Sequence, residues 1–288
     1  MIIAVASGKG GTGKTSVATS LALSLPDVQF LDCDVEAPNS HIFLKPEITE
    51  ERESVILVPE IDENRCDSCG ICQKICEFNA LTVIPGMNGE NGKMLRFDSL
   101  CHGCGACAAL CPQKAIREVP RAIGTVRFGQ SENLAGDPID VVSGSLNAGE
   151  TLSPPVIRDV RSHTNQDKTV IIDAPPGTSC PVVASLKGAD YCILVTEPTP
   201  FGLHDLSLAV ELNQDLGIPM GVIINRSDLG DTAVEDFCYQ HDIPVLLKIP
   251  FRKEIARAYA GGKPLVSLEP EYTRYLERLF QPRELMKG

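Results

Sequence analysis

The chain has 288 residues, of which 43% are hydrophobic, and it carries a formal net charge of −12 at pH 7. This length accommodates one large domain, or a domain with a small insert, and no apolar run approaches the ~18 residues of a membrane span. Residues 1–7 lack the basic start of a signal peptide, so we expect a cytoplasmic protein. The acidic charge argues against binding to nucleic acid or to an anionic membrane surface, so we expect no nucleic-acid partner and no stable membrane association.

A glycine-rich loop follows the first predicted strand, at 2–6, and leads into a helix that begins near Gly13. The loop matches G-x-x-x-x-G-K-[ST] from Gly8 to Thr15, and its backbone N–H groups can converge on a phosphate chain. Lys14 can reach the β- and γ-phosphates, and the Thr15 hydroxyl can bind Mg²⁺. A glycine-rich turn with a solvated lysine is the alternative, but strand, loop and helix together predict a nucleotide site. The residues predicted to bind nucleotide here are Gly8, Lys9, Gly10, Gly11, Thr12, Gly13, Lys14, Thr15 and Ser16.

Lys9 is a second lysine inside this loop. The run G-K-G-G-T-G-K-T resembles the deviant Walker A motif of the MinD/ParA/Mrp ATPases and of the nitrogenase iron protein. The resemblance implies an ATP-binding, Mg²⁺-dependent ATPase that is slow without a partner. It also implies a nucleotide-dependent homodimer, in which Lys9 reaches the partner's nucleotide. The alternative for Lys9 is an exposed charge on a loop.

The predicted strand at 28–32 ends in an acidic run, D-x-D-x-x-x-P-N, from Asp32 to Asn39. In an open α/β sheet the carboxyl ends of strands form the ligand-binding edge, so this run should lie beside the glycine-rich loop. The run resembles switch I of the MinD family, which implies that Asp34 positions the attacking water near Mg²⁺. Asp32 is either functional or a structural carboxylate that caps the loop. Cys33 is expected to be a buried filler.

A strand is predicted at 53–58. It is followed by a cysteine-rich segment that contains an internal repeat of 35 residues. Each half has the spacing C-x₂-C-x₂-C-x₃-C, which is typical of bacterial ferredoxins with two [4Fe–4S] clusters. In that arrangement the fourth thiolate of each run binds the other cluster. A zinc site is the alternative, but zinc needs separated C-x₂-C pairs and the third cysteine would be superfluous. The predicted ligand sets are Cys66, Cys69, Cys72 and Cys111 for the first cluster, and Cys101, Cys104, Cys107 and Cys76 for the second.

One position departs from the ferredoxin pattern. The first run has Glu77 where the second keeps Pro112, which should alter the local turn without abolishing cluster binding. His102 is interpreted as a surface residue, because the thiolates already complete the ligand count. The segment 85–92 predicts a turn-rich hairpin connection.

Strands are expected again at 124–128, 139–142 and 168–173, with a helix beginning after Pro155. The last of these strands ends in Asp173, and the following run to Thr178 resembles the Walker B and switch II sequence of the Mrp-like branch. The resemblance implies that Asp173 holds the Mg²⁺ shell. It also implies that Gly177 senses the γ-phosphate through its backbone.

The remaining chain alternates between strands and helices. Strands are predicted at 191–196, 220–224 and 245–249, and helices at 202–214, at 232–240 and up to residue 260. A terminal helix at 272–280 should pack on the core and not act as a membrane-targeting helix, because its polar face mixes charges. Alternation of this kind predicts an α/β fold with a doubly wound, mostly parallel sheet. The resemblance implies that Asn225 reads the adenine and that Pro250 borders its pocket.

Three cysteines outside the repeat need separate interpretations. Cys180 lies seven positions after Asp173, a spacing similar to that of a cluster-binding cysteine in the nitrogenase iron protein. No cysteine between 112 and 179 could match that protein's other ligand, so a buried structural role is favoured. Cys192 and Cys238 lie in apolar surroundings and are expected in the core.

The chain is therefore predicted to be a MinD/Mrp-type P-loop ATPase of residues 1–58 and 121–288, with a small α+β ferredoxin domain inserted at 59–120. The leading hypothesis is ATP-dependent electron transfer through two [4Fe–4S] clusters to or from an unidentified redox protein. A second is an iron–sulfur cluster scaffold or carrier, although no C-x-x-C pair follows Cys111. A third is a redox-sensing positioning ATPase, which the acidic charge disfavours.

Overall fold

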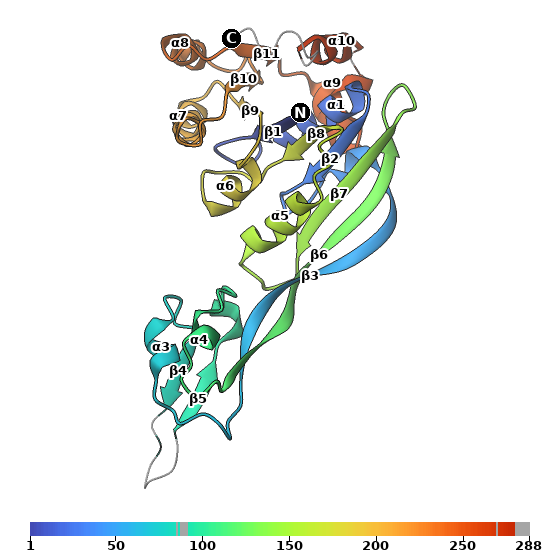
Figure 1. Cartoon of the computed structure of the whole chain (residues 1–288). Helices are drawn as coiled ribbons and strands as arrows, with labels where there is room; N and C mark the ends of the chain where they lie inside the picture. The colour runs from blue at the N-terminus through green and yellow to red at the C-terminus, as the bar shows by residue number, and fades with distance from the viewer. Residues whose placement is uncertain (85, 87–91, 269, 280–288) are drawn as a thin grey trace. The chain divides into compact units, whose positions relative to one another are not determined.

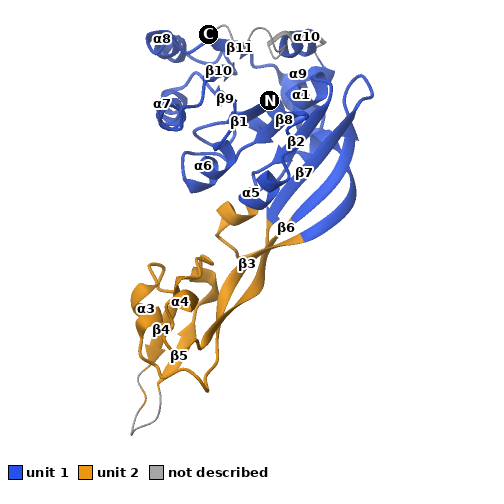
Figure 2. Ribbon diagram, in the orientation of Figure 1, with its two compact units in different colours: residues 1–52, 126–145, 157–288 blue, residues 53–125, 146–156 orange. Residues whose placement is uncertain are grey.

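The structure is a computed structural model, and it describes residues 1–84, 86, 92–268 and 270–279. The chain forms two compact units (Figure 2). Unit 1 contains residues 1–52, 126–145 and 157–288, and unit 2 contains residues 53–125 and 146–156. Within the described ranges, no helix has both the length and the hydropathy that crossing a membrane requires.

A nine-stranded sheet runs through the structure (Figure 1) in the order β11-β10-β9-β1-β8-β2-β7-β6-β3. The strands from β11 to β7 pair in parallel, so the prediction of a mostly parallel sheet is confirmed. These strands are rich in Val, Ile and Leu, as expected where both faces of a sheet are covered. In chain order, all the strands of the sheet are β1 (Ile2–Ala6), β2 (Val28–Asp32), β3 (Glu47–Ile61), β6 (Ile116–Glu132), β7 (Pro138–Leu146), β8 (Thr169–Asp173), β9 (Tyr191–Thr196), β10 (Met220–Asn225) and β11 (Val245–Ile249).

Strand β1 lies at the switch point of this sheet. Its residue Ile3 aligns with Ile171 of β8 on one side and with Tyr191 of β9 on the other. The chain leaves β1 toward β2 on the β8 side, and later crosses from β8 to β9. Ligands bind at such a point, beyond the carboxyl ends of the strands, and the loop at 7–13 starts there.

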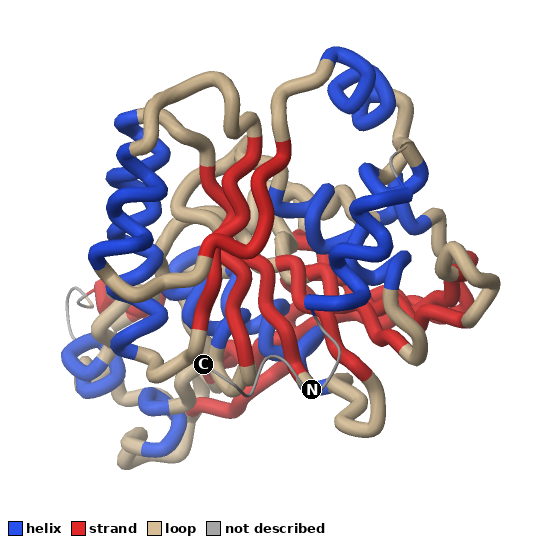
Figure 3. Tube along the Cα trace, turned by 90° about the horizontal axis from the view of Figure 1, so that it is seen from above, coloured by secondary structure: helices blue, strands red, loops and turns tan. Residues whose placement is uncertain are grey.

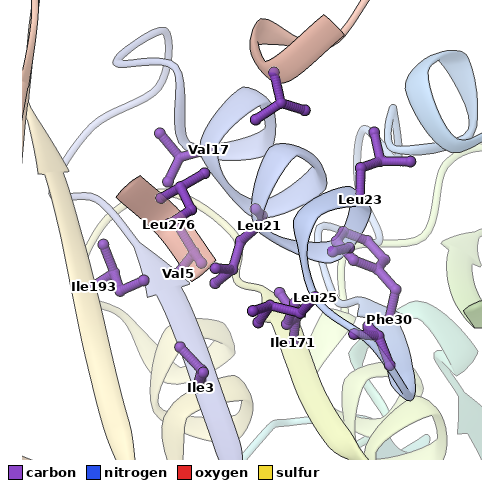
Figure 4. Packing of buried hydrophobic residues seen from close by; sticks show 14 of the residues in the cluster. Ile3, Val5, Val17, Leu21, Leu23, Leu25, Phe30, Ile171, Ile193 and Leu276 are labelled. Atoms are coloured by element: carbon purple, nitrogen blue, oxygen red, sulfur yellow. The ribbon is translucent and has the colours of Figure 1, made fainter. Parts of the chain in front are cut away.

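The main core lies around α1 (Lys14–Ser24), whose surface is buried on nearly every side. Figure 4 shows Val17 and Leu21 of α1 packed among Val5, Ile171 and Leu276. Leu276 belongs to α10 (Pro270–Leu279), so the prediction that the terminal helix packs on the core is confirmed.

The other helices of the sheet flank it on both faces (Figures 1 and 3). Near α1 are α2 (His41–Leu44), α9 (Lys253–Ala260) and the 3₁₀ turn η2 (Leu265–Ser267). The opposite face carries α5 (Ser153–Ser162), α6 (Cys180–Leu186), α7 (Pro200–Asp215) and α8 (Ala233–Gln240). The Thr199 side chain caps α7 by accepting a hydrogen bond from the Gly202 N–H at 3.0 Å.

Unit 2 contains short elements between the long strands β3 and β6. They are α3 (Ile71–Ile75), β4 (Leu81–Ile84), β5 (Lys93–Arg96), η1 (Asp98–Leu100) and α4 (Ala106–Ala109). β4 and β5 form a two-stranded antiparallel sheet. The hairpin connection predicted between them falls largely on 85 and 87–91, outside the described residues.

Two strands begin well before their predicted first residues. β3 begins at Glu47 and β6 begins at Ile116, whereas the predicted strands covered only 53–58 and 124–128. The first part of β3 is exposed and charged, and therefore carries no alternating apolar pattern from which a strand could be recognised.

Candidate functional site

The loop at 7–13 is a glycine-rich turn between β1 and α1. Gly11 and Gly13 have φ angles of 83° and 93°, in the left-handed region that side chains disfavour. A Cβ atom on Gly8 would lie 2.1 Å from the Asp205 carbonyl oxygen, so only glycine fits there. These constraints explain the glycines and leave the loop amides free to face a ligand.

Lys14 lies at the start of α1, and its side chain is only 7% exposed. Its Nζ atom is 2.5 Å from Oδ1 of Asp173 and 3.7 Å from Oδ2 of Asp34. Burial lowers the pKa of Lys14, but Asp173 and Asp34 outweigh it and raise the pKa overall. The lysine therefore stays charged, surrounded by carboxylates from the ends of two neighbouring strands.

Asp173 is fully buried at the carboxyl end of β8. Its Oδ2 atom has no hydrogen-bond partner among the described residues. A buried carboxylate oxygen without a partner is costly unless a cation binds it. Asp173, the nearby Asp34 and the hydroxyl of Thr15 are hard oxygen ligands, so this set fits Mg²⁺.

Asp32 holds the loop that carries Asp34. Its Oδ1 accepts the Asp34 N–H at 3.1 Å, and its Oδ2 accepts both the N–H and the hydroxyl of Ser40. Burial, followed by the charge of Asp173, raises the pKa of Asp32 to about 7. Burial likewise raises the pKa of Asp34, against the opposing charge of Lys14. This geometry matches the loop-capping alternative for Asp32.

Lys14 and Asp34 border a cavity of about 420 Å³ in unit 1. Among the predicted site residues, those that line it are Lys9, Gly10, Gly11, Gly13, Lys14, Thr15, Ser16, Asp34, Asn225 and Pro250. The lining does not include Gly8, Thr12 or Asp173. Asn225 contacts Thr12 by donating a hydrogen bond from Nδ2 to the Thr12 carbonyl at 2.8 Å. Asn225 therefore ties the end of β10 to the glycine-rich loop.

Lys9 does not point freely into solvent. Its Nζ atom lies 3.7 Å from Oε2 of Glu197, whose Oε1 accepts a hydrogen bond from Nη1 of Arg226 at 2.6 Å. The Lys9 side chain keeps 30% of its surface exposed. Lys9 and Arg226 thus share one carboxylate at the rim of the cavity.

Several lining residues were missed by sequence reasoning. Phe251, Arg252, Ile255 and Tyr259 follow the carboxyl end of β11 and form an apolar wall with one basic residue. Only their position after a parallel strand pointed to the site, because no motif marks them. They extend the cavity beyond the glycine-rich loop.

Two smaller cavities lie inside unit 2, and each is bordered by four cysteines. Cavity 1 is lined by Cys66, Cys69, Cys72 and Cys111. Cavity 2 is lined by Cys76, Cys101, Cys104 and Cys107. Each therefore combines three cysteines of one half of the repeat with the fourth cysteine of the other half.

The two fourth cysteines have matching environments. The Ala80 N–H donates to Cys76 Sγ at 3.2 Å, and the Ala115 N–H donates to Cys111 Sγ at 3.3 Å. Such amide donors stabilise a thiolate ligand. In the described ranges no three His, Cys, Asp or Glu side chains converge on one metal-ion position. A four-iron cluster is instead bound by four thiolates, and each of the two cavities is lined by four cysteines.

The cysteines outside the repeat differ from one another. Cys33, Cys192 and Cys238 are buried as predicted. The interpretation of Cys180 as buried is wrong, because this residue is exposed at the first position of α6. The buried face of α6 is formed by Val182, Ser185 and Leu186, and Cys180 lies on the other side of the helix.

A family of nucleotide-binding domains and several individual proteins are similar to this chain. The CobQ/CobB/MinD/ParA nucleotide binding domain matches residues 3–265 of the chain. An uncharacterized protein of Methanocaldococcus jannaschii is 32% identical over 257 residues, which is 87% of this chain and 86% of that protein. An uncharacterized ATP-binding protein of the same organism is 23% identical over 93% of this chain and 81% of its own length. An iron-sulfur cluster carrier protein of Rickettsia bellii is 32% identical over 103 residues, which is 34% of this chain and 32% of that protein.

Two solved structures share the fold. The septum site-determining protein MinD of Pyrococcus horikoshii, complexed with Mg-ADP, aligns with a TM-score of 0.58 and 18% identity, over 99% of this chain and 97% of its own. The cell division ATPase MinD of Pyrococcus furiosus aligns with a TM-score of 0.55 and 18% identity, over 96% of each chain. At such identities the similarity concerns the fold.

Proposed function

The chain belongs to the CobQ/CobB/MinD/ParA nucleotide binding domain family, and on this premise we propose that it is an Mg²⁺-dependent ATPase coupling ATP binding to electron transfer through two [4Fe–4S] clusters. The proposal joins two parts of one chain. Unit 1 contains the nucleotide-binding loop and the acidic strand ends, and unit 2 contains the two cysteine-lined cavities.

In the nucleotide half, the amides of the loop at 8–13 cradle the phosphates at the amino end of α1. Lys14 neutralises charge that develops on the γ-phosphate, and Asp34 orients the attacking water. Thr15 and Asp173 would hold Mg²⁺, which would neutralise negative charge on the phosphates. The unpartnered Asp173 Oδ2 supports this assignment. Gly177, with a φ of 99°, is the residue proposed to sense the γ-phosphate.

The same cavity also offers a place for the nucleotide base. Asn225 and Pro250 border the space beyond the phosphate loop, with Phe251 and Tyr259 as apolar neighbours. We assign this space to the adenine, which stacks well on apolar and aromatic side chains. Asn225 then acts in two ways, as a contact to the base and as the tie to Thr12.

Lys9 is assigned to a partner subunit's nucleotide. Its partial exposure and its long contact with Glu197 leave it able to change partners at low cost. A triphosphate from a second copy presents several charged oxygens and outcompetes one carboxylate. ATP binding would in this way close a homodimer and rearrange the segments that carry Asp34 and Asp173.

In the cysteine half, Cys66, Cys69, Cys72 and Cys111 would hold one cluster, and Cys76, Cys101, Cys104 and Cys107 the other. A [4Fe–4S] cluster bound in such a set accepts or donates one electron. The single observation that carries the proposal is that each cavity collects four cysteines from both halves of the repeat. A structural repeat without clusters gives no reason for this exchange.

The test is anaerobic purification with iron and sulfide analysis, followed by redox titration with and without Mg-ATP. We expect two [4Fe–4S] clusters per chain and a potential or transfer rate that changes when Mg-ATP binds. A protein free of iron would refute the cluster assignment. Identical redox behaviour in both nucleotide states would refute the coupling.

A second candidate function is cluster transfer. The local similarity to an iron-sulfur cluster carrier protein, over 34% of this chain, favours it. The absence of a C-x-x-C pair after Cys111 opposes it. Incubation with an apo-acceptor distinguishes the two, because a carrier activates the acceptor, whereas an electron-transfer protein retains its iron.

A further inference from the structure

The two halves of the cysteine repeat differ at the residue that follows the first cysteine. This residue is Asp67 in the first half and His102 in the second, 35 positions later. Asp67 pairs with Gln113, whose Nε2 donates to Oδ2 at 2.9 Å. His102 stacks on Phe78, with ring centroids 3.6 Å apart and planes 5° apart. Phe78 and Gln113 also lie 35 positions apart, so the two pairs occupy equivalent places, one at each cavity.

Asp67 also takes up a backbone N–H group at cavity 1. Oδ1 of Asp67 accepts the Cys69 N–H at 3.2 Å. The equivalent amide at cavity 2 belongs to Cys104, and this N–H has no acceptor in the described part of the chain. An imidazole stacked on a ring cannot take the place of the carboxylate. The Cys104 N–H is therefore free to donate to sulfur, and the Cys69 N–H is not.

The amide donors to the fourth cysteine of each half are matched. Cys76 and Cys111 each accept one backbone N–H, from Ala80 and Ala115. Hydrogen bonds to cluster or cysteine sulfurs raise the reduction potential, because they stabilise the extra negative charge of the reduced state. The hydrogen bond from the Cys69 N–H to Asp67 is therefore a difference between the two cavities that the matched donors do not offset.

Charge alone does not separate the cavities. Asp67 lies at cavity 1, and Glu118 lies at cavity 2, with its Oε1 3.1 Å from the position of a Cβ built on Gly105. Each carboxylate disfavours added negative charge nearby. Asp67 acts in two ways, through its charge and through the Cys69 amide, whereas Glu118 acts through charge only.

Given the two clusters of the proposed function, we propose that Asp67 makes cavity 1 the position of lower reduction potential. Asp67 is here a tuning residue and not a ligand. At cavity 2 the corresponding residue is His102, which stacks on Phe78 and supplies no carboxylate acceptor. The duplicated halves would in this way have diverged into a lower-potential and a higher-potential position.

The test is an EPR-monitored potentiometric titration of the anaerobic, full-length protein. We expect two separate midpoint potentials in the natural chain. Asp67→Ala removes both effects and should raise the lower midpoint, and Asp67→Asn, which keeps an acceptor oxygen, should raise it less. His102→Asp copies the first half into the second and should lower the higher midpoint. Glu118→Gln is the matched control for charge, and it should raise only the higher midpoint.

Iron and sulfide analysis of each variant verifies that both clusters remain. A chain without iron refutes the proposed function itself. Clusters that are present but share one midpoint in the natural chain refute the inference alone. The same holds if Asp67→Ala moves the higher midpoint or neither of them. Because Asp67→Ala and His102→Asp act in opposite directions on different cavities, faulty assembly of one variant leaves the other as a decisive measurement.

Discussion

The Nζ atom of Lys14 lies 2.5 Å from Oδ1 of Asp173, although the two residues are 159 positions apart in the chain. The Asp173 side chain is completely buried and that of Lys14 nearly so. The lysine at the start of α1 and the carboxylate at the end of β8 therefore form a buried ion pair. In the proposed function, Lys14 contacts the γ-phosphate instead, and Asp173 becomes available to a cation.

Replacement of Lys14 by Ala should weaken Mg-ATP binding by about 10- to 100-fold, the effect of losing a charged hydrogen bond. Calorimetric titration with Mg-ATP measures the change. Lys168→Ala is the matched control, because Lys168 pairs with Asp140 at 2.6 Å and is not part of the cavity lining. Equal affinity in the Lys14 variant and the natural chain would contradict the assigned phosphate contact.

Replacement of Lys9 by Ala should separate binding from dimer formation. The contact of Lys9 with Glu197 is long and partly exposed, so its loss should change Mg-ATP affinity of one subunit by less than about threefold. ATP-dependent dimerisation, measured by light scattering after gel filtration, should disappear. A variant that dimerises as the natural chain does would show that Lys9 has no role between subunits.

Replacement of Asn225 by Ala removes the hydrogen bond to the Thr12 carbonyl, at a cost of about 1 kcal/mol. We expect Mg-ATP affinity to fall about fivefold, because the glycine-rich loop loses one of its fixed points. Gln130→Ala, which removes an exposed hydrogen bond to Asp140, is the control. If both variants bind Mg-ATP equally well, the tie between Asn225 and the loop does not contribute to binding.

Replacement of Cys111 by Ala should cost cavity 1 one ligand and leave the set of cavity 2 complete. Bound iron and sulfide, measured on anaerobic protein, should then fall by about half. Cys180→Ala is the control, because this exposed thiol belongs to neither cavity. A loss of iron in the Cys180 variant would mean that the ligand sets are different.

Replacement of Asp32 by Asn should flatten the pH dependence of stability. The pKa of Asp32 is raised to about 7 in the folded chain, so the folded state holds this proton more tightly than the unfolded state does. The associated stability is fully present below about pH 4 and is lost as the pH rises through about 7. Urea unfolding at pH 5 and pH 8 should show a smaller difference for Asp32→Asn than for the natural chain. An unchanged difference would assign the pH dependence to other groups.

Much of unit 1 could be predicted because its signals are local. The buried strands β2, β9 and β11 have the predicted bounds, since each is a short apolar run between polar segments. The glycine-rich loop and the acids at strand ends were recognisable for the same reason. A parallel sheet then brings those strand ends to one edge, so the placement of Lys14 beside Asp173 follows from topology.

Other features depend on tertiary contacts that leave no local pattern. The bond from Asn225 to Thr12 joins residues 213 positions apart and carries no sequence signature. The exposure of Cys180 follows from which face of α6 packs inward. The apolar wall of Phe251 and Tyr259 is a set of ordinary helix and loop residues until β11 places it beside the phosphate loop.

The exchange of Cys76 and Cys111 between the cavities also has an evolutionary consequence. If the clusters of the proposed function are present, each half of the repeat depends on the other for the fourth ligand of its cluster, and neither half can be deleted alone without leaving the other incomplete. The two halves of the repeat would then have to be kept together in the chain.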